Sequence, residues 1–322
     1  MKRLAVLTSG GDAPGMNAAI RAVVRTAVAG GLEVLGVRHG YAGLIGGDFL
    51  PLGRRDVGGI IDQGGTLLGT SRCAAFLTAQ GQTTAVRQLS DRDIGGLIVI
   101  GGNGSQQGAH ALSERGVGVV GIASTVDNDL YGSDVTIGAT TAVDVALEAI
   151  DRLRTTAAAH GRVFLIELMG RACGYLALLA GITGGAEAIV VPEIEHSPEQ
   201  VAVAVREAYA RGKSHAIVIV AEGARHNAAA LQRYFSEHAE RLGFELRVST
   251  LGHIQRGGAP RAFDRLSATL LGTAAVEQLQ AQHGMLMGII NGQVTATPLA
   301  EAVRATKPLD LRLLKLAQLL AE

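Results

Sequence analysis

The sequence predicts an α/β fold with mostly parallel sheets. Short apolar runs recur along the chain, and each is followed by a glycine-rich or polar break and then by a helical pattern. The chain has 322 residues, enough for about two domains at roughly 150 residues each. Because no Pro- or Ser-rich linker separates two halves, we expect the two domains to be interleaved rather than consecutive.

The first element pair is the clearest. An apolar run at 4–7 leads into a glycine-rich turn, a helical pattern over 16–29 with Pro14 before its first turn, a stop at Gly30-Gly31 and a second run at 33–37. This order predicts a strand–helix–strand unit. A later helix should begin at Ser197, because Ser197-Pro198-Glu199-Gln200 is typical of a capped helix start, and should end near Gly212. Further strands are expected at 97–100, 117–122, 163–168, 216–221 and 246–251.

Composition excludes several classes of protein. Lys+Arg and Asp+Glu are both 29, and only 3% of residues are aromatic, so the chain lacks the basic, stacking surface of a nucleic-acid binder. Cys73 and Cys173 lie too far apart in the sequence to match the ligand spacing of a zinc site, and we expect both to be reduced thiols. The N-terminal apolar run is too short for a signal peptide, and glycines and Glu187 interrupt the longest apolar region, so we expect no membrane segment and a cytoplasmic protein.

The polar breaks follow the strands, where parallel sheets bind ligands. Glycine makes up 44 of the 322 residues, about twice the usual share of ~7%, and the breaks at 8–15 and 101–105 are glycine-rich turns feeding helices, which suit an anion. Asp127 and Asp129 follow the strand expected at 117–122. One rim carrying phosphate cradles, paired carboxylates and arginines indicates phosphoryl transfer. The later breaks contribute Arg171, Glu222, His253 and Arg256.

One motif allows another interpretation. Gly102-Asn103-Gly104 with Gly108 is similar to a loose dinucleotide fingerprint and keeps a dinucleotide-dependent oxidoreductase open as an alternative. That enzyme would need a ribose-binding acid after the next strand, and it leaves the arginines unexplained. Gly212-Lys213-Ser214 is similar to the tail of a P-loop, but it follows a helix and precedes a strand, the reverse of the required order.

Several long motifs, in order, resemble the bacterial ATP-dependent 6-phosphofructokinase family. They are Thr8–Arg21, Gly101–Ser105, Thr125–Asp129, Met169–Arg171 and Gly252–Gly258. The resemblance runs from about residue 3 to past residue 290. It implies two interleaved three-layer α/β domains with mostly parallel sheets: a nucleotide-binding domain of residues 1–138 plus about 252–304, and a sugar-phosphate domain of residues 139–251 plus about 305–322.

The activity implied by the resemblance is transfer of the γ-phosphoryl group of ATP to the 1-hydroxyl of fructose 6-phosphate, the committed step of glycolysis. Asp127 would be the base, with Thr125, Arg171, Arg72 and Gly11 at the transferring phosphate. The ATP site would comprise Gly11, Arg72, Cys73, Gly102, Asn103, Gly104, Ser105 and Gly108. Asp129, with Asn103, would hold Mg²⁺. Fructose 6-phosphate would meet Thr125, Asp127, Met169, Gly170, Arg171, Glu222, His253 and Arg256, with Arg162 and Arg247 reaching in from a neighbouring subunit.

A second basic set matches the family's effector site between subunits of a homotetramer. Arg21 and Arg25 lie four residues apart on one helix, a like-charge spacing that is unfavourable unless an anion lies between them. The resemblance adds further residues and implies a nucleoside diphosphate or phosphoenolpyruvate as effector. The set is Arg21, Arg25, Arg54, Arg154, Glu187, Arg211 and Lys213.

The sequence departs from the family pattern at the metal site. Asn103 replaces the usual aspartate, so a carboxamide without charge stands where a carboxylate would help to hold Mg²⁺. This leaves a weakly active or regulatory paralogue as an alternative. Relatives that use pyrophosphate carry Lys at the position of Ser124 and Asp at that of Gly104. Gly104 leaves room for the α-phosphate of a nucleotide and Ser124 offers no cation, so we expect ATP rather than pyrophosphate as donor.

Overall fold

The computed structural model describes residues 1–244 and 246–321, and the chain divides into two compact units. The first unit comprises Met1–Thr141 and Arg256–Lys307, and the second comprises Ala142–Gln255 and the described residues from Pro308 onward. Each unit is therefore formed by segments that are far apart in the sequence. In the described part of the chain, none of the helices has both the length and the apolar character needed to cross a bilayer.

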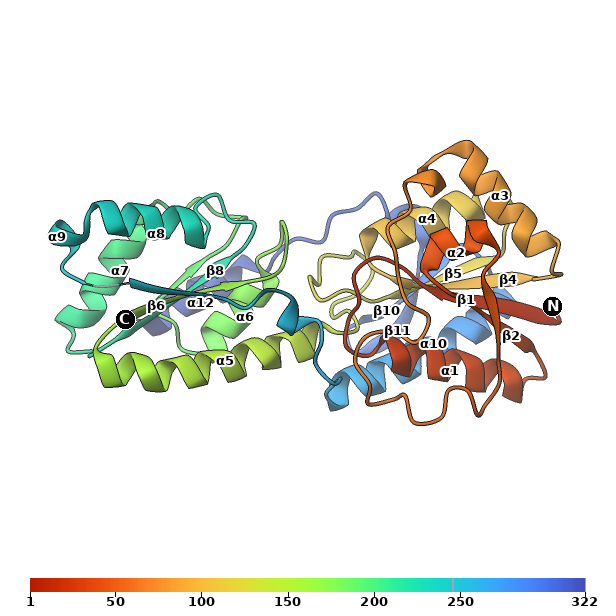
Figure 1. Cartoon of the computed structure of the whole chain (residues 1–322), viewed down its shortest axis with the longest axis horizontal. Helices are drawn as coiled ribbons and strands as arrows, with labels where there is room; N and C mark the ends of the chain where they lie inside the picture. Colours follow the sequence, from red (N-terminus) through yellow and green to blue (C-terminus); the bar gives the residue numbers. More distant parts are fainter. Residues whose placement is uncertain (245, 322) are drawn as a thin grey trace. The chain divides into compact units, whose positions relative to one another are not determined.

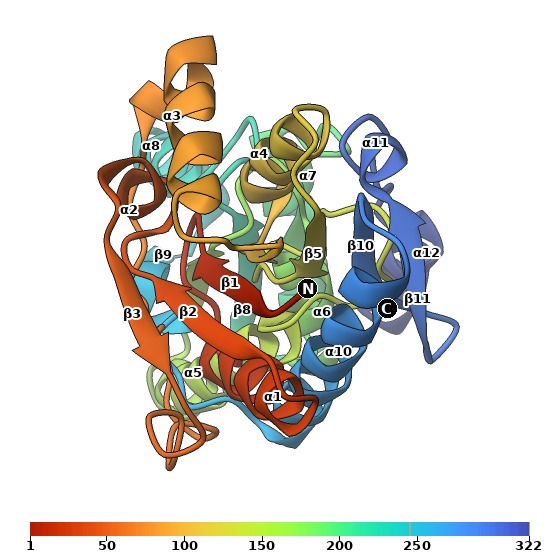
Figure 2. The same cartoon turned by 90° about the vertical axis from the view of Figure 1, so that its right-hand side faces the viewer.

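A seven-stranded sheet forms the centre of the first unit. Its order is β11-β10-β5-β4-β1-β2-β3, and Figure 2 shows β3, β2 and β1 towards one side and β5, β10 and β11 towards the other. The five inner strands are parallel, whereas the two edge strands, β3 and β11, pair antiparallel with their neighbours. The bounds are β1 Arg3–Thr8, β2 Glu33–Val37, β3 Phe49–Leu52, β4 Gly96–Gly101, β5 Val119–Ala123, β10 Met285–Ile290 and β11 Gln293–Pro298.

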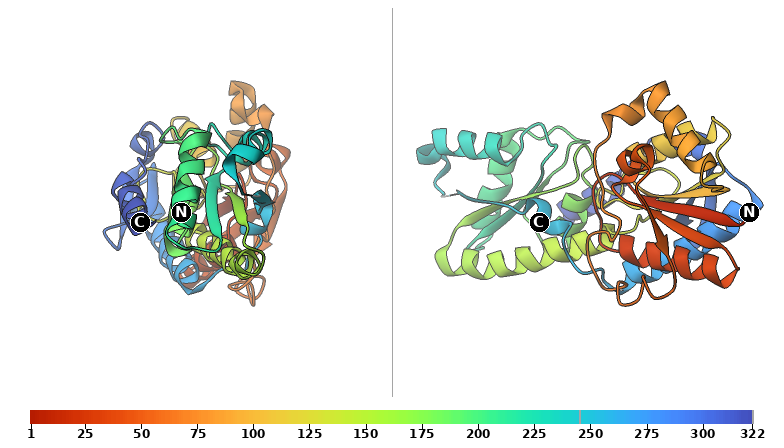
Figure 3. Two further views of the ribbon diagram at one scale, coloured as in Figure 1. Left: turned by 90° about the vertical axis from the view of Figure 1, so that its left-hand side faces the viewer. Right: turned by 45° about the vertical axis from the view of Figure 1, so that its right-hand side comes forward.

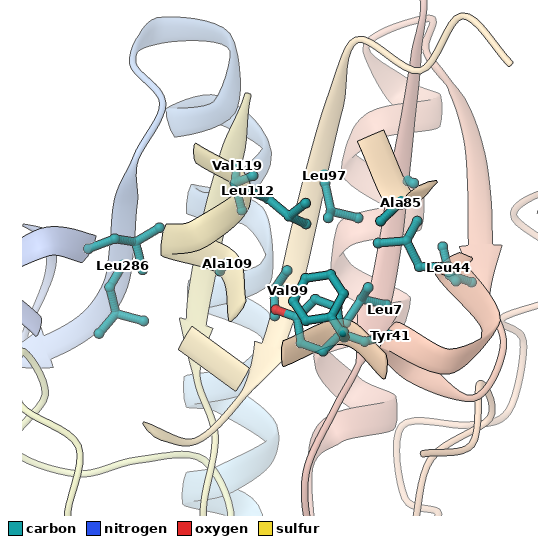
Figure 4. Packing of buried hydrophobic residues seen from close by; sticks show 14 of the residues in the cluster. Leu7, Tyr41, Leu44, Ala85, Leu97, Val99, Ala109, Leu112, Val119 and Leu286 are labelled. Atoms are coloured by element: carbon teal, nitrogen blue, oxygen red, sulfur yellow. The ribbon is translucent and has the colours of Figure 1, made fainter. Parts of the chain in front are cut away.

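Helices cover both faces of this sheet, which gives the unit three layers (Figure 1). Helices α1 and α10 pack together on one face, and α2, α3, α4 and α11 lie on the other. Figure 4 shows the second interface, where Tyr41 and Leu44 from α2 and Leu112 from α4 meet Leu7 and Val99 of the sheet. The bounds are α1 Met16–Ala29, α2 Gly40–Gly46, η1 Ala74–Leu77, α3 Ala79–Ser90, α4 Asn103–Ser113, α10 Ala262–Ala281 and α11 Leu299–Ala302.

A four-stranded parallel sheet forms the centre of the second unit, in the order β7-β8-β6-β9. Helices α5, α6 and α12 cover one face, and α7 and α8 cover the other (Figure 3). The strands are β6 Val163–Leu168, β7 Ala188–Val190, β8 Ala216–Ala221 and β9 Leu246–Thr250. The helices are α5 Ala139–His160, α6 Tyr175–Thr183, α7 Pro198–Ala210, α8 Ala228–Glu237, α9 Ala239–Leu242, η2 Gly252–Gln255 and α12 Leu311–Ala321; the first three residues of α5 belong to the first unit.

The predicted α/β class is confirmed, and so is the start of α7. The Ser197 hydroxyl accepts a hydrogen bond from the Gln200 N–H (3.3 Å), while the Gln200 side chain accepts one from the Ser197 N–H (2.7 Å). The expectation of one common rim was wrong. Strands β1, β4 and β5 belong to one sheet, and β6, β8 and β9 belong to the other, so their polar breaks do not lie at the edge of a single sheet. The sequence could not predict this, because an apolar run predicts a strand but does not specify which strand it pairs with.

Candidate active site

The first unit has a topological switch between its neighbouring strands β1 and β4. From β1 the chain passes through α1 to β2 on one side, and from β4 it passes through α4 to β5 on the other. The carboxyl ends of the strands at such a switch are the usual ligand position in a sheet of this kind. The loops that follow these two strands are the glycine-rich turns noted in the sequence.

Glycines allow three loops to pack closely at this switch. A Cβ on Gly101 would lie 2.6 Å from the Ser9 carbonyl oxygen, and one on Gly102 would lie 3.1 Å from the Thr125 Cβ. The loop after β4 therefore touches both the loop after β1 and the loop after β5. Side chains larger than hydrogen at 101 or 102 would separate the loops.

The N-terminus of α4 points its N–H groups into the same region. Its N-cap is Gly102, which has no side chain to bond the first amides, so these donors are open to an anion. Apart from the adjacent residues and the backbone of the same helix, no described atom lies within 4 Å of a Cβ built on Gly104. The buried Tyr41 hydroxyl donates a hydrogen bond to the Ser105 carbonyl (2.6 Å). Burial raises the pKa of Tyr41, so the hydroxyl stays protonated and remains a donor. Uncapped amides with open space in front of them suit a nucleotide phosphate.

The loop after β5 holds a buried carboxylate. Asp127 is only 4% exposed, and its N–H donates to the Thr125 hydroxyl (3.2 Å). Asn128 adopts a left-handed backbone (φ 52°), and its side-chain oxygen accepts from the Thr136 N–H (2.9 Å). The Thr136 hydroxyl in turn donates to the Thr125 carbonyl (2.6 Å). This network fixes the backbone on both sides of Asp127, which preorganises its carboxylate.

Two predicted metal-site residues lie at the same edge. The Asn103 amide Nδ2 lies 3.4 Å from the Asp129 carbonyl oxygen, so the two residues are adjacent. Among the described residues no group of three or more His, Cys, Asp or Glu side chains could enclose a metal. One carboxylate and one carboxamide fit Mg²⁺ only if water and phosphate oxygens supply most of its ligands, which is the usual arrangement for this ion at a nucleotide.

Arg256 lies against the loop after β1. Its Nη1 donates to the Asp12 carbonyl (3.0 Å), and the side chain is 7% exposed. A Cβ on Gly11 would lie 2.5 Å from that same Nη1. Arg256 was expected among the sugar-phosphate residues, and this contact to the loop after β1 is an addition that the sequence did not predict. Arg72 is exposed, and the predicted nucleotide residue Cys73 follows it. Two residues before Arg72, the Thr70 hydroxyl donates to the Gly10 carbonyl (2.7 Å) and joins this segment to the loop after β1.

The second unit brings several predicted sugar-phosphate residues together. The Arg171 N–H donates to Glu222 Oε1 (2.9 Å), and a Cβ on Gly223 would lie 1.6 Å from the Arg171 carbonyl, so the loops after β6 and β8 are in direct contact. The Met169 N–H donates to the buried Gln255 side chain (2.9 Å). Gly170 (φ 140°) turns the chain between these anchors. The exposed His253 lies in η2, the exposed Arg247 in β9, and Arg162 just before β6.

The predicted effector residues fall into two groups. In the second unit, Glu187 accepts from Lys213 (2.9 Å) and from the Ile217 N–H (2.6 Å). Arg154 bonds the Gly184 carbonyl beside them, so Arg154, Glu187 and Lys213 surround one turn. Arg211 follows directly on α7. The other three residues, Arg21, Arg25 and Arg54, lie in the first unit.

The sequence did not predict the residues whose hydrogen bonds hold the loops of Met169 and Asp127 in place. Gln255 holds the loop of Met169, and Thr136 and Asn128 hold that of Asp127. Gln255 and Asn128 stood inside quoted motifs, which was a usable signal. Thr136 had none, because its contact spans 11 residues of irregular chain.

An α/β sheet with an uncapped helix start beside a buried aspartate, and with Asn103 and Asp129 adjacent at the same edge, is typical of a phosphoryl-transfer enzyme. The comparisons specify which kind. The family model for phosphofructokinase matches residues 3–279. ATP-dependent 6-phosphofructokinase 1 of Thermus thermophilus is 54% identical, and the enzyme of Thermotoga neapolitana is 47% identical; each alignment covers all of both chains. The chain belongs to the phosphofructokinase family.

A solved structure agrees in fold. Phosphofructokinase from Saccharomyces cerevisiae superposes with a TM-score of 0.87 at 36% identity, over 94% of this chain. The chain spans 45% of that longer yeast chain, and the whole of the curated bacterial relatives.

Proposed function

We propose that this protein is an ATP-dependent 6-phosphofructokinase, which transfers the γ-phosphoryl group of ATP to the 1-hydroxyl of fructose 6-phosphate and releases ADP and fructose 1,6-bisphosphate. The observation that carries the proposal is a direct contact, through Gly102 and Thr125, between the loop after β4, called the donor loop from here on, and the loop of Asp127. A carboxylate held next to an open helix N-terminus can accept a proton while the phosphate is held by N–H groups.

The first unit supplies the donor side. The amides at Gly11 and at the start of α4 bind phosphate oxygens, and Arg72 neutralises the charge that spreads over the transferring group. Position 108 on α4 requires glycine, because a Cβ there would lie 2.6 Å from the Tyr41 ring. Asp129 and Asn103 would hold Mg²⁺, which would supply charge neutralisation at the phosphates.

Asp127 acts as the general base. Its carboxylate accepts the proton of the sugar 1-hydroxyl as the oxygen attacks the γ-phosphorus, and Thr125 fixes the loop that carries it. The second unit supplies the sugar-phosphate side, where Glu222 accepts from sugar hydroxyls and Arg171, His253, Arg162 and Arg247 bind anionic oxygens. The Glu222–Arg171 backbone bond supports this role, because it orders the loop before the ligand arrives.

ATP is favoured over pyrophosphate as donor. Gly104 has open space in front of it, where a nucleotide can extend. The Ser124 side chain is fully buried and points to the Ile137 carbonyl (3.4 Å), so it presents no group to a pyrophosphate. The full-length curated relatives are named as ATP-dependent enzymes.

The assembly and regulation are further parts of the proposal. The chain works as a homotetramer in the cytoplasm, where ATP and sugar phosphates are available. Arg162 and Arg247 serve a neighbouring subunit. A nucleoside diphosphate or phosphoenolpyruvate binds the effector residues, and the pairing of the buried Glu187 with Lys213 supports this, because an anionic effector would compete for the lysine.

Replacing the base tests the mechanism. Asp127→Asn keeps the shape of the side chain but cannot accept the proton, so we expect kcat to fall by about 10²- to 10⁴-fold. Formation of fructose 1,6-bisphosphate is measured by a coupled assay, and ATP binding by calorimetry should be retained. A variant with wild-type kcat would refute the role of Asp127, and a wild-type protein that uses only pyrophosphate would refute the donor.

A further inference from the structure

Gln106 is a fully buried polar side chain beneath the donor loop. It lies on the first turns of α4, and its amide Nε2 is within hydrogen-bond distance of three carbonyl oxygens: Gly101 (2.9 Å), Ile122 (3.2 Å) and Val99 (3.3 Å). Gly101 and Val99 belong to β4 and Ile122 to β5. A single amide therefore bridges the carboxyl ends of both strands.

The position of this bridge matters because each strand leads directly into part of the site. The donor loop begins after Gly101, and the loop of Asp127 begins after β5. The Gly101 carbonyl also accepts from the Ser124 N–H (3.2 Å), so this oxygen is the junction of the two loops. An amide has two hydrogens, and sharing them among three carbonyls holds those oxygens at one fixed spacing.

A glycine on β5 makes room for the amide. A Cβ on Gly121 would lie 2.1 Å from Gln106 Oε1 and 2.9 Å from its Cδ. The same oxygen is buried and has no hydrogen-bond partner among the described residues. Leaving a buried acceptor unsatisfied is unfavourable, so the contact with the three carbonyls must offset it. A purely space-filling role would be served better by an apolar side chain.

We propose that Gln106 is a positioning residue for phosphoryl transfer: its amide fixes the separation between the donor loop and the loop of Asp127. It touches neither substrate. The inference rests on the proposed roles of these two loops. A displacement of about 1 Å in a catalytic group lowers the rate by up to about 10²-fold. Loss of the Gln106 amide therefore lowers kcat and leaves the binding of each substrate nearly unchanged.

The matched test compares two neighbouring glutamines. Gln106→Met keeps the length of the side chain and removes its donors, and Gln107→Met makes the same change at an exposed position of the same helix. For Gln106→Met we expect kcat to fall about ten- to hundredfold with both KM values within about twofold of wild type. For Gln107→Met we expect no change. Unchanged kcat in Gln106→Met, or a rise in both KM values that follows a loss of thermal stability, would overturn the proposal.

A double-mutant cycle covers the case in which Gln106→Met does not fold. Gly121→Ala displaces the amide and should lower kcat in the native background. In a Gln106→Ala background, which leaves space for the new methyl group, it should lower kcat no further. Additive losses would contradict the coupling. A wild-type enzyme inactive with ATP and fructose 6-phosphate would refute the proposed function instead, whereas an active wild type with an unaffected Gln106→Met would remove only this inference.

Discussion

At the residue scale, the contact between Gly11 and Arg256 requires glycine at position 11, because a larger residue there would collide with the arginine. The guanidinium of Arg256 occupies the space that a Cβ on Gly11 would need, and it bonds the neighbouring Asp12 carbonyl. A fixed positive charge therefore lies against the loop that we propose to bind the transferring phosphate. The two residues are 245 positions apart in the numbering, so neither predicts the other from local sequence.

Asn103 stands where the family resemblance implies an aspartate. Its amide lies near the Asp129 carbonyl at the first position of α4. We expect Asn103→Asp to lower the Mg²⁺ concentration for half-maximal rate by about fivefold, because an added carboxylate worth roughly 1 kcal/mol changes an affinity by that factor. Magnesium titrations at saturating ATP and fructose 6-phosphate measure this. Identical magnesium curves and rates for both proteins would contradict it.

At the element scale, one carboxylate joins three helices of the second unit. Glu199 on α7 accepts from Arg241 of α9 (2.7 and 3.0 Å), from the Tyr234 hydroxyl of α8 (2.7 Å) and from Arg206 (3.0 Å). The hydrogen bonds from Arg241, and then from Tyr234, lower the pKa of Glu199 from an ordinary 4.5 to about 2. The cluster is partly exposed, so its contribution depends on geometry and on several charges acting together.

This cluster predicts a pH dependence of stability. The pKa of Glu199 is lowered by folding, so its contribution to the free energy of unfolding is complete above pH 4.5 and is lost as the pH falls towards 2. Glu199→Gln should therefore be less stable than wild type at pH 7, and the difference should shrink below pH 4.5. Urea unfolding at several pH values measures it. Glu207→Gln, an exposed change on the same helix, is the control; an equal pH profile for wild type and Glu199→Gln would contradict the prediction.

At the scale of the whole molecule, the predicted use of a neighbour's arginines can be tested by mixing subunits. If Arg162 acts on a neighbouring chain, a hybrid of Asp127→Asn and Arg162→Ala subunits contains some sites with both native residues. Activity should then recover after the two inactive variants are unfolded and refolded together. Recovery is measured by fructose 1,6-bisphosphate formation.

The control mixture combines Asp127→Asn with Arg72→Ala. Both residues belong to the first unit and should serve the same site of one chain, so no hybrid site is intact. No recovery in the test mixture would show that Arg162 acts within its own chain, and equal recovery in the control would show that the recovery does not depend on a shared Arg162.

Local pattern predicted the elements well where they are buried and parallel. The structure has strands at Glu33–Val37, Val163–Leu168 and Ala216–Ala221 and a helix at Met16–Ala29, with the bounds that the sequence indicated. The edge strand β3 and the hairpin of β10 and β11 were not predicted, because proline, glycine and threonine interrupt their apolar patterns.

By itself, the sequence determined the α/β class, the helix starts and the loops that carry the chemistry, since each depends on neighbours along the chain. Only the tertiary structure decided which strands pair within each of the two sheets, that Arg256 lies on the loop of Gly11, and that Gln106 bridges β4 and β5. These contacts join distant residues, and their identity depends on strand pairing and close packing, which local periodicity does not specify.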